Sequence, residues 1–135
     1  MAEVLIVDDY EPWLRLVQSQ ILSQPGLVPV ATAADGFSAI QRARELAPDV
    51  VLLDINLPGC SGFEAAREIR KITPRSHIIF VSLFFSLAFV EAALDLGARG
   101  FLSKNDHDEL LLAIQVVLAG ERYLSKSIRH FPFQR

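Results

Sequence analysis

Cysteine is almost absent from this chain, and so is any long run of apolar residues. Cys60 is the single cysteine among 135 residues, which excludes an internal disulfide or a zinc site of several thiolates and fits a reducing compartment. Charged or polar residues interrupt every apolar stretch before the roughly 18 residues that a membrane-spanning helix needs. The N-terminus MAEVLIVDD has no basic segment before its apolar residues, so we expect no signal peptide. These absences predict a cytoplasmic protein with no membrane partner.

Basic charge is also scarce over most of the chain. The formal net charge is −3, but residues 120–135 hold four basic residues against one acidic residue, so the first 119 residues carry −6. An acidic body argues against nucleic-acid binding by the main domain. With 135 residues, of which 51% are hydrophobic, the chain has the size of one globular domain with a single core.

Short segments of aliphatic and β-branched residues alternate with stretches of helical periodicity. Five strands are expected, at residues 4–7, 28–33, 50–53, 78–81 and 100–102. Their apolar runs are continuous, which favours strands buried on both faces of a parallel sheet. Between them, apolar residues such as Leu14, Val17 and Ile21 recur on one helical face. The pattern Asp106-x-x-Glu109 predicts a capping box at the start of the last helix. The alternation predicts an α/β fold, a (βα)5 doubly wound sheet.

Polar side chains stand where these strands end. Asp8 and Asp9 follow the first strand, Asp54 the third and Ser82 the fourth, while Lys104 comes shortly after the fifth. In open sheets of this kind, ligands bind at the carboxyl ends of the strands. Neighbouring carboxylates repel one another unless a cation intervenes, and an all-oxygen cluster suits Mg²⁺, which pairs with phosphate. A carboxylate can also attack phosphorus, and a lysine and a hydroxyl can hold the phosphoryl oxygens.

Four stretches of the sequence resemble the receiver domain of two-component response regulators over about residues 3–119: VLIVDD, VVLLDINLPGCSGFE, IIFVS and GARGFLSK. The resemblance implies a flavodoxin-like fold with five parallel strands in the order 2-1-3-4-5. The ending AIQVVLAGERYLS further resembles the NarL/FixJ class, whose receivers precede a LuxR-type helix-turn-helix domain. We expect the receiver domain at residues 1–120, and the start of an interdomain linker or a C-terminal tail at residues 121–135.

The resemblance implies a magnesium site around a phosphoacceptor. Asp54 is the implied phosphoacceptor and one of the metal ligands. Asp9 is implied to bind Mg²⁺ directly and Asp8 mainly through water, and the backbone carbonyl of Asn56 completes the protein ligands. Taken alone, Asp8 and Asp9 are also compatible with capping a helix, because aspartate is common at that position.

The resemblance also implies three residues that respond to the phosphoryl group. Ser82 is the implied switch hydroxyl, Lys104 the phosphate-binding lysine and Phe101 the switch aromatic. Each has a simpler alternative: serine is common in turns, lysine on surfaces and phenylalanine in cores.

The function implied is that of a signalling switch rather than of an enzyme. A sensor histidine kinase is the expected phosphodonor, and DNA is expected to be bound only through an output domain outside this chain. Apolar side chains on the fourth and fifth helices, and on the loop before the fourth, predict homodimerisation or partner docking through the face of these helices and the fifth strand. They are Phe84, Phe85, Phe89, Leu112 and Val116.

Two other functions remain open on the residues alone. One is a receiver-like interaction module that works without phosphorylation. The other is a small phosphohydrolase with an aspartate nucleophile, but such enzymes typically carry a second carboxylate two residues later, where this chain has Asn56.

Overall fold

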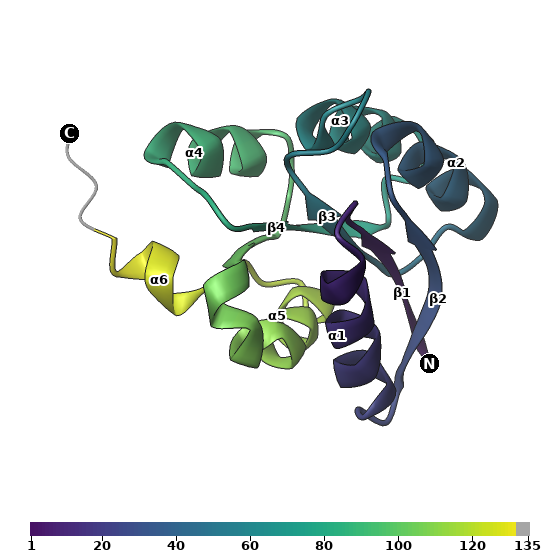
Figure 1. Cartoon of the computed structure of the whole chain (residues 1–135), viewed down its shortest axis with the longest axis horizontal. Coiled ribbons are helices and arrows are strands. Elements are labelled where there is room, and N and C mark those ends of the chain that lie inside the picture. The colour runs from purple at the N-terminus through teal and green to yellow at the C-terminus, as the bar shows by residue number, and fades with distance from the viewer. Residues whose placement is uncertain (132–135) are drawn as a thin grey trace.

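A parallel sheet divides the molecule into two helical layers in the computed structural model, which describes residues 1–131 (Figure 1). The five predicted strands are confirmed to within one or two residues at their ends, and the predicted order is confirmed within a sheet ordered β2-β1-β3-β4-β5-β6. The strands are β1 (Ala2–Val7), β2 (Leu27–Ala33), β3 (Val50–Asp54), β4 (His77–Ser82), β5 (Gly100–Ser103) and β6 (Tyr123–Leu124). The sheet therefore has one strand more than the five that the sequence predicts.

The helices lie on both faces of the sheet, as expected for a doubly wound fold. In Figure 1, α2, α3 and α4 cover one face, while α1 and α5 cover the other. The helices are α1 (Glu11–Leu22), α2 (Gly36–Leu46), α3 (Gly62–Ile72), α4 (Leu87–Asp95), α5 (Leu110–Leu118) and α6 (Lys126–Arg129), with a 3-10 helix η1 (Lys104–Glu109) before α5.

The alternation of side chains along β1 builds two cores, one in each layer. Val4 and Ile6 pack with α1 and α5, whereas Leu5 and Val7 pack with α2, α3 and α4. All four are buried, and each full burial of such a side chain stabilises the fold by about 1.5–3 kcal/mol. Burial on both faces explains why the apolar runs are continuous.

Capping side chains fix where several helices begin. A capping box is present at α3, where Ser61 Oγ accepts from the backbone N–H of Glu64 and Glu64 Oε1 accepts from that of Ser61, each at 3.2 Å. The capping box predicted at Asp106 and Glu109 is wrong. Both residues belong to η1, and Ser103 caps this turn through the N–H of Asn105 instead.

The chain does not leave the sheet after α5. Strand β6 pairs in parallel with β5, with Gly100 opposite Tyr123 and Phe101 opposite Leu124. Residues 121–131 thus pack on the domain, while residues 132–135, the last part of the predicted linker or tail, lie outside the described residues. Within residues 1–131, no helix has the length and apolar character needed to cross a membrane.

Candidate functional site

The carboxyl ends of four neighbouring strands bring the predicted polar residues to one edge of the sheet. Asp8 and Asp9 follow β1, Asp54 ends β3 and Ser82 ends β4, while Lys104 follows β5. The strands are adjacent in the order β1-β3-β4-β5, so their ends form one continuous rim. The topology alone therefore gathers residues that are up to 96 positions apart in the sequence.

Lys104 provides the positive charge of this rim. Its Nζ lies 2.6 Å from Asp8 Oδ2 and 3.8 Å from Asp54 Oδ2. The ammonium group also lies 5.3 Å from the centre of the Trp13 ring on α1, a distance at which a cation and an aromatic face attract. Lys104 thus contacts both buried carboxylates, and the simpler alternative of a plain surface charge does not describe it.

The three carboxylates differ in their exposure to water. Asp8 is fully buried and Asp54 is 6% exposed, whereas Asp9 is exposed. Burial, and next the charge of Asp8, raise the pKa of Asp54 to about 6, against the lowering effect of Lys104. One positive charge does not compensate three neighbouring negative charges, so the cluster attracts a further cation.

The same carboxylates are close enough to share that cation. Asp8, Asp9 and Asp54 each offer an oxygen, and these oxygens lie within 4.8 Å of one another. The buried Oδ2 of Asp8 has its ion pair with Lys104 but accepts no hydrogen bond within residues 1–131. Asn56, whose carbonyl is the fourth predicted ligand, follows Asp54 by two residues in an exposed position.

The loop after Asp54 depends on the absence of a side chain at Gly62. A Cβ atom at this position would collide with the carbonyl oxygen of Asp54. The N–H of Gly62 also donates to the carbonyl of Ile55 at 2.8 Å. The start of α3 is therefore held directly against the backbone of the predicted phosphoacceptor.

Ser82 forms a tight turn with the loop that follows β4. Its Oγ donates to the carbonyl of Phe84 at 2.5 Å and accepts from the N–H of Phe84 at 3.2 Å. Asp54 pairs with Val81 across the sheet, so this hydroxyl lies one residue beyond the level of the phosphoacceptor. The Ser82 hydroxyl therefore donates its single proton to the loop backbone in this structure.

Phe101, the predicted switch aromatic, is fully buried in β5. Its ring centroid lies 6.2 Å from that of Phe80 in a tilted arrangement. The backbone carbonyl of Phe101 accepts from the N–H of Ser125, just after β6. Phe101 thus joins the core on one side and the C-terminal residues on the other.

Sequence patterns missed a second polar cluster, close to the first. Asp106 is buried, and its Oδ2 accepts from Ser125 Oγ at 2.7 Å and from the N–H of Ser127 at 2.9 Å. Its Oδ1 accepts from Ser127 Oγ at 2.7 Å. Burial opposes ionisation of Asp106, but these hydrogen bonds outweigh it and lower the pKa of the carboxyl group. The sequence carries a weak signal for this cluster, two serines spaced two residues apart directly after β6.

Of the apolar patch predicted over the fourth and fifth helices, Phe84 and Phe89 are exposed, at 70% and 40%. The ring of Phe89 also meets that of Phe63 on α3 edge-on, with ring centroids 5.8 Å apart. Phe85 is half-buried, and its ring meets that of Phe131 edge-on at 5.2 Å. Leu112 remains 51% exposed on α5 and supports the prediction. Packing outside the two helices, which the sequence does not reveal, decides which way each ring points.

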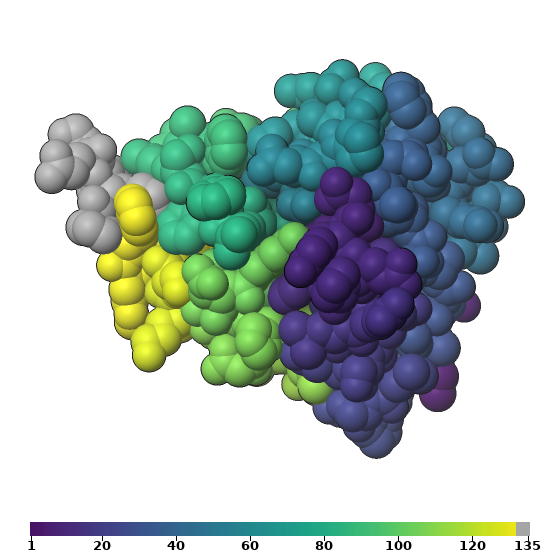
Figure 2. Space-filling view, viewed as in Figure 1, coloured from purple at the N-terminus to yellow at the C-terminus, as the bar shows by residue number. Residues whose placement is uncertain are grey.

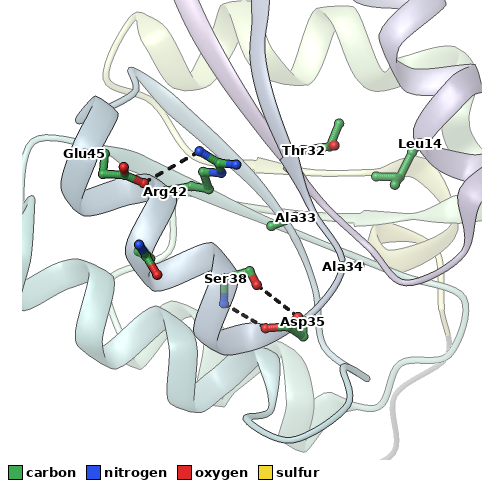
Figure 3. A pocket seen from close by; sticks show the side chains of 9 residues that line it. Leu14, Thr32, Ala33, Ala34, Asp35, Ser38, Arg42 and Glu45 are labelled. Carbon is green, nitrogen blue, oxygen red and sulfur yellow. Dashed lines mark hydrogen bonds and ion pairs between the residues drawn. The ribbon is translucent and has the colours of Figure 1, made fainter.

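A separate hollow of about 410 Å³ lies between α1, the end of β2 and α2 (Figure 3). Asp35 caps α2 there by accepting from the N–H of Ser38 at 2.7 Å and from its hydroxyl at 3.0 Å. Arg42 and Glu45 form an exposed ion pair at 3.7 Å on the same wall. Because these polar groups bind one another, the hollow offers no comparable site, and the carboxylate rim remains the candidate.

The doubly wound parallel sheet defines the flavodoxin-like class of folds, and the polar rim stands where such folds bind ligands. The model of the response regulator receiver domain matches residues 4–115, and the chain belongs to this family. The predicted resemblance is confirmed.

The relatives also support the predicted NarL/FixJ class. The chain is 39% identical over 128 residues to the transcriptional activator protein ExaE of Pseudomonas putida, covering 93% of this chain and 59% of ExaE. It is 35% identical over 134 residues to the nitrate/nitrite response regulator protein NarP of Escherichia coli, covering 98% of this chain and 62% of NarP. The chain thus spans about three fifths of the length of these curated relatives.

Among solved structures, the chain resembles a LuxR-family two-component response regulator from Aurantimonas sp. SI85-9A1. The TM-score is 0.91 at 36% identity, covering 96% of this chain and 93% of that one. The flavodoxin-like fold and the LuxR-type relationship therefore rest on agreement in both sequence and structure.

Proposed function

We propose that this chain is a phosphorylation-activated receiver domain that accepts a phosphoryl group on Asp54 from a sensor histidine kinase. The position of Lys104 carries the proposal, because its ammonium group reaches both Asp8 and Asp54 at the rim of the sheet. Such a group can hold an incoming phosphoryl oxygen beside the carboxylate that attacks it.

The rim also fits Mg²⁺. All its donors are oxygens, and Asp8 Oδ2 is buried without a hydrogen bond within residues 1–131. We assign Asp9 and Asp54 as direct ligands, Asp8 as a ligand mainly through water, and the backbone carbonyl of Asn56 as the remaining protein ligand. When bound, the ion neutralises charge on the phosphoryl oxygens during transfer.

The transfer forms one bond and breaks another at phosphorus. A carboxylate oxygen of Asp54 attacks the phosphorus of the donor phosphohistidine, and the new O–P bond forms as the P–N bond breaks. The electron pair of the P–N bond returns to the imidazole ring, which takes up a proton from solvent. Lys104 and Ser82 then hold the phosphoryl oxygens, one by charge and one by a hydrogen bond.

The phosphoryl group acts as a switch by competing for the proton of Ser82. That hydroxyl donates to the carbonyl of Phe84, and it cannot donate to a phosphoryl oxygen at the same time. Rearrangement of this turn, with Phe101 as the responding aromatic, shifts the domain between two states. The domain is a signalling component, and we propose that it regulates transcription through an output domain.

The output surface is the face formed by α4, β5 and α5. The half-exposed Leu112 on α5 supports homodimerisation or partner docking there. We expect light scattering to show a larger species after phosphorylation than before it, and a constant mass would contradict the dimer.

Incubation with Mg²⁺ and acetyl phosphate, followed by intact-mass measurement, tests the function. We expect a stable phosphoryl adduct on the wild type and on the control Asp95→Asn, which changes an exposed aspartate at the end of α4. Asp54→Asn should form no adduct. Continuous release of phosphate without an adduct would indicate a hydrolase instead, and no reaction at all would indicate a phosphorylation-independent interaction module.

A further inference from the structure

Residues 121–131, which we call the docked segment, continue the sheet beyond β5. The N–H of Tyr123 donates to the carbonyl of Arg99 at 2.9 Å, and the N–H of Ser125 donates to that of Phe101 at 3.1 Å. Ile128 of α6 is buried in the core that lies under α2, α3 and α4. Figure 2 shows the yellow atoms of this segment lying against the green atoms of the domain. The docked segment is therefore packed on the domain through backbone and core contacts.

The docked segment binds the residues on both sides of Lys104. Ser125 Oγ accepts from the backbone N–H of Ser103, the residue before the lysine, at 2.9 Å. The same hydroxyl donates to Asp106, two residues after the lysine, and Ser127 adds two more hydrogen bonds to that carboxylate. The residues on either side of Lys104 are thus hydrogen-bonded to the docked segment.

Glu109, a second carboxylate of η1, also binds the docked segment. Glu109 Oε1 accepts from the hydroxyl of Tyr123 at 2.5 Å, and both of its oxygens accept from the N–H of Lys126, at 3.2 and 3.1 Å. Arg129 Nη1 lies 3.8 Å from Glu109 Oε1, and Arg129 Cζ lies 5.7 Å from the centre of the Tyr123 ring. Glu109 of η1 therefore contacts the docked segment from β6 to the end of α6.

The far end of the docked segment reaches the loop that carries the switch hydroxyl. The ring of Phe131 meets that of Phe85 edge-on at 5.2 Å. Phe85 directly follows Phe84, whose carbonyl accepts the proton of Ser82. One segment thus contacts the surroundings of both groups that we assign to the phosphoryl oxygens, Ser82 and Lys104.

We propose that the docked segment is a regulatory element whose hold on the domain weakens when Asp54 is phosphorylated. This inference rests on the function proposed above. When Ser82 donates to a phosphoryl oxygen, its hydrogen bond to Phe84 is lost and the loop that contacts Phe131 is freed. When Lys104 turns from Asp8 to the phosphoryl group, the turn fastened by Asp106 must adjust as well.

Coupling between two sites is reciprocal. If phosphorylation weakens docking, loss of docking must favour the phosphorylated state by the same factor. A purely structural role for the docked segment predicts the opposite, because loss of its contacts would loosen Lys104 and weaken binding at the site. The sign of the effect therefore separates the two roles.

Binding of beryllofluoride, a phosphoryl mimic, in the presence of Mg²⁺ tests the coupling in the full chain. Trp13 provides the signal, because its ring lies beside Lys104. We expect Ser127→Ala and Phe131→Ala to bind the mimic about five- to tenfold more tightly than the wild type. The matched control Ser19→Ala, an exposed position on α1, should leave the affinity unchanged.

Hydrogen exchange on the wild type gives a second measurement. We expect the backbone amides of residues 123–129 to lose protection when the mimic binds. If the mimic binds but neither the affinities nor the protection change as expected, the inference is wrong and the proposed function stands. If the wild type binds no mimic at all, the proposed function fails, and this inference fails with it.

Discussion

Asp54 and Asp106 are both buried near Lys104, but their surroundings act on them in opposite directions. Asp54 has two other carboxylates beside it, and its pKa rises to about 6. Asp106 accepts three hydrogen bonds from Ser125 and Ser127, and its pKa falls below the usual value. Hydrogen bonds outweigh burial at Asp106, so its ionised carboxylate stabilises the fold. At Asp54, burial and the charge of Asp8 outweigh Lys104 and the backbone hydrogen bonds, so the ionised group favours a further cation beside it.

Among substitutions that test this comparison, removal of Lys104 should change stability most. Lys104→Met leaves Asp8 buried without its cation, so we expect the free energy of unfolding in EDTA to fall by about 3 kcal/mol. Chemical denaturation at neutral pH measures it, and added Mg²⁺ should restore part of the loss. The control Lys71→Met breaks an exposed pair with Glu68 and should cost less than about 1 kcal/mol. Equal losses in the two variants would contradict the special role of Lys104.

A smaller loss of stability is expected on replacement of Asp106, whose carboxylate accepts hydrogen bonds from Ser125 and Ser127. Asp106→Asn presents an amide N–H₂ group to donors, so the free energy of unfolding should fall by about 2 kcal/mol. The lowered pKa stabilises the fold above the unfolded-state pKa of about 3.9, and this contribution disappears as the pH falls through the folded-state value. Variant and wild type should therefore differ most in stability at pH 6, and the difference should shrink as the pH falls below the unfolded-state pKa. Asp108→Asn, at an exposed position of η1, is the control and should change little.

The smallest expected effect is a gain in stability, on replacement of Asp54, where the two substitutions above cause a loss. Ionised Asp54 disfavours the fold, because its folded-state pKa of about 6 lies above the unfolded-state value. Stability from this group is present below the unfolded-state pKa of about 3.9 and is lost as the pH rises through about 6. Asp54→Asn should therefore be more stable than the wild type by about 1–2 kcal/mol at pH 7.5 in EDTA, and equally stable near pH 4. A variant that is less stable at pH 7.5 would show that repulsion does not dominate the rim.

The rim could be predicted from sequence because each of its residues closely follows an apolar run. Continuous burial identifies the strands, and parallel strands bring their carboxyl ends to one edge of the sheet. Asp8, Asp54, Ser82 and Lys104 then meet without any further information.

The second cluster could not be predicted in the same way. The pattern Asp106-x-x-Glu109 fits a capping box, and the true partners of Asp106 lie 19 and 21 residues further along the chain. A strand of two residues has no periodicity to reveal it. Helix α4 is apolar on nearly every side, so its sequence does not indicate that Phe89 faces α3. Long-range packing decides these features.

The cover that β6 gives to β5 has a consequence for the recognition of other molecules. Within residues 1–131, strand β5 has β4 on one side and the two residues of β6 on the other. If the docked segment leaves, the N–H and C=O groups along that side lose their partners, and an open strand edge is a template on which another chain can add a strand. A signal received as a phosphoryl group on one carboxylate would then be passed on as a row of unpaired peptide groups.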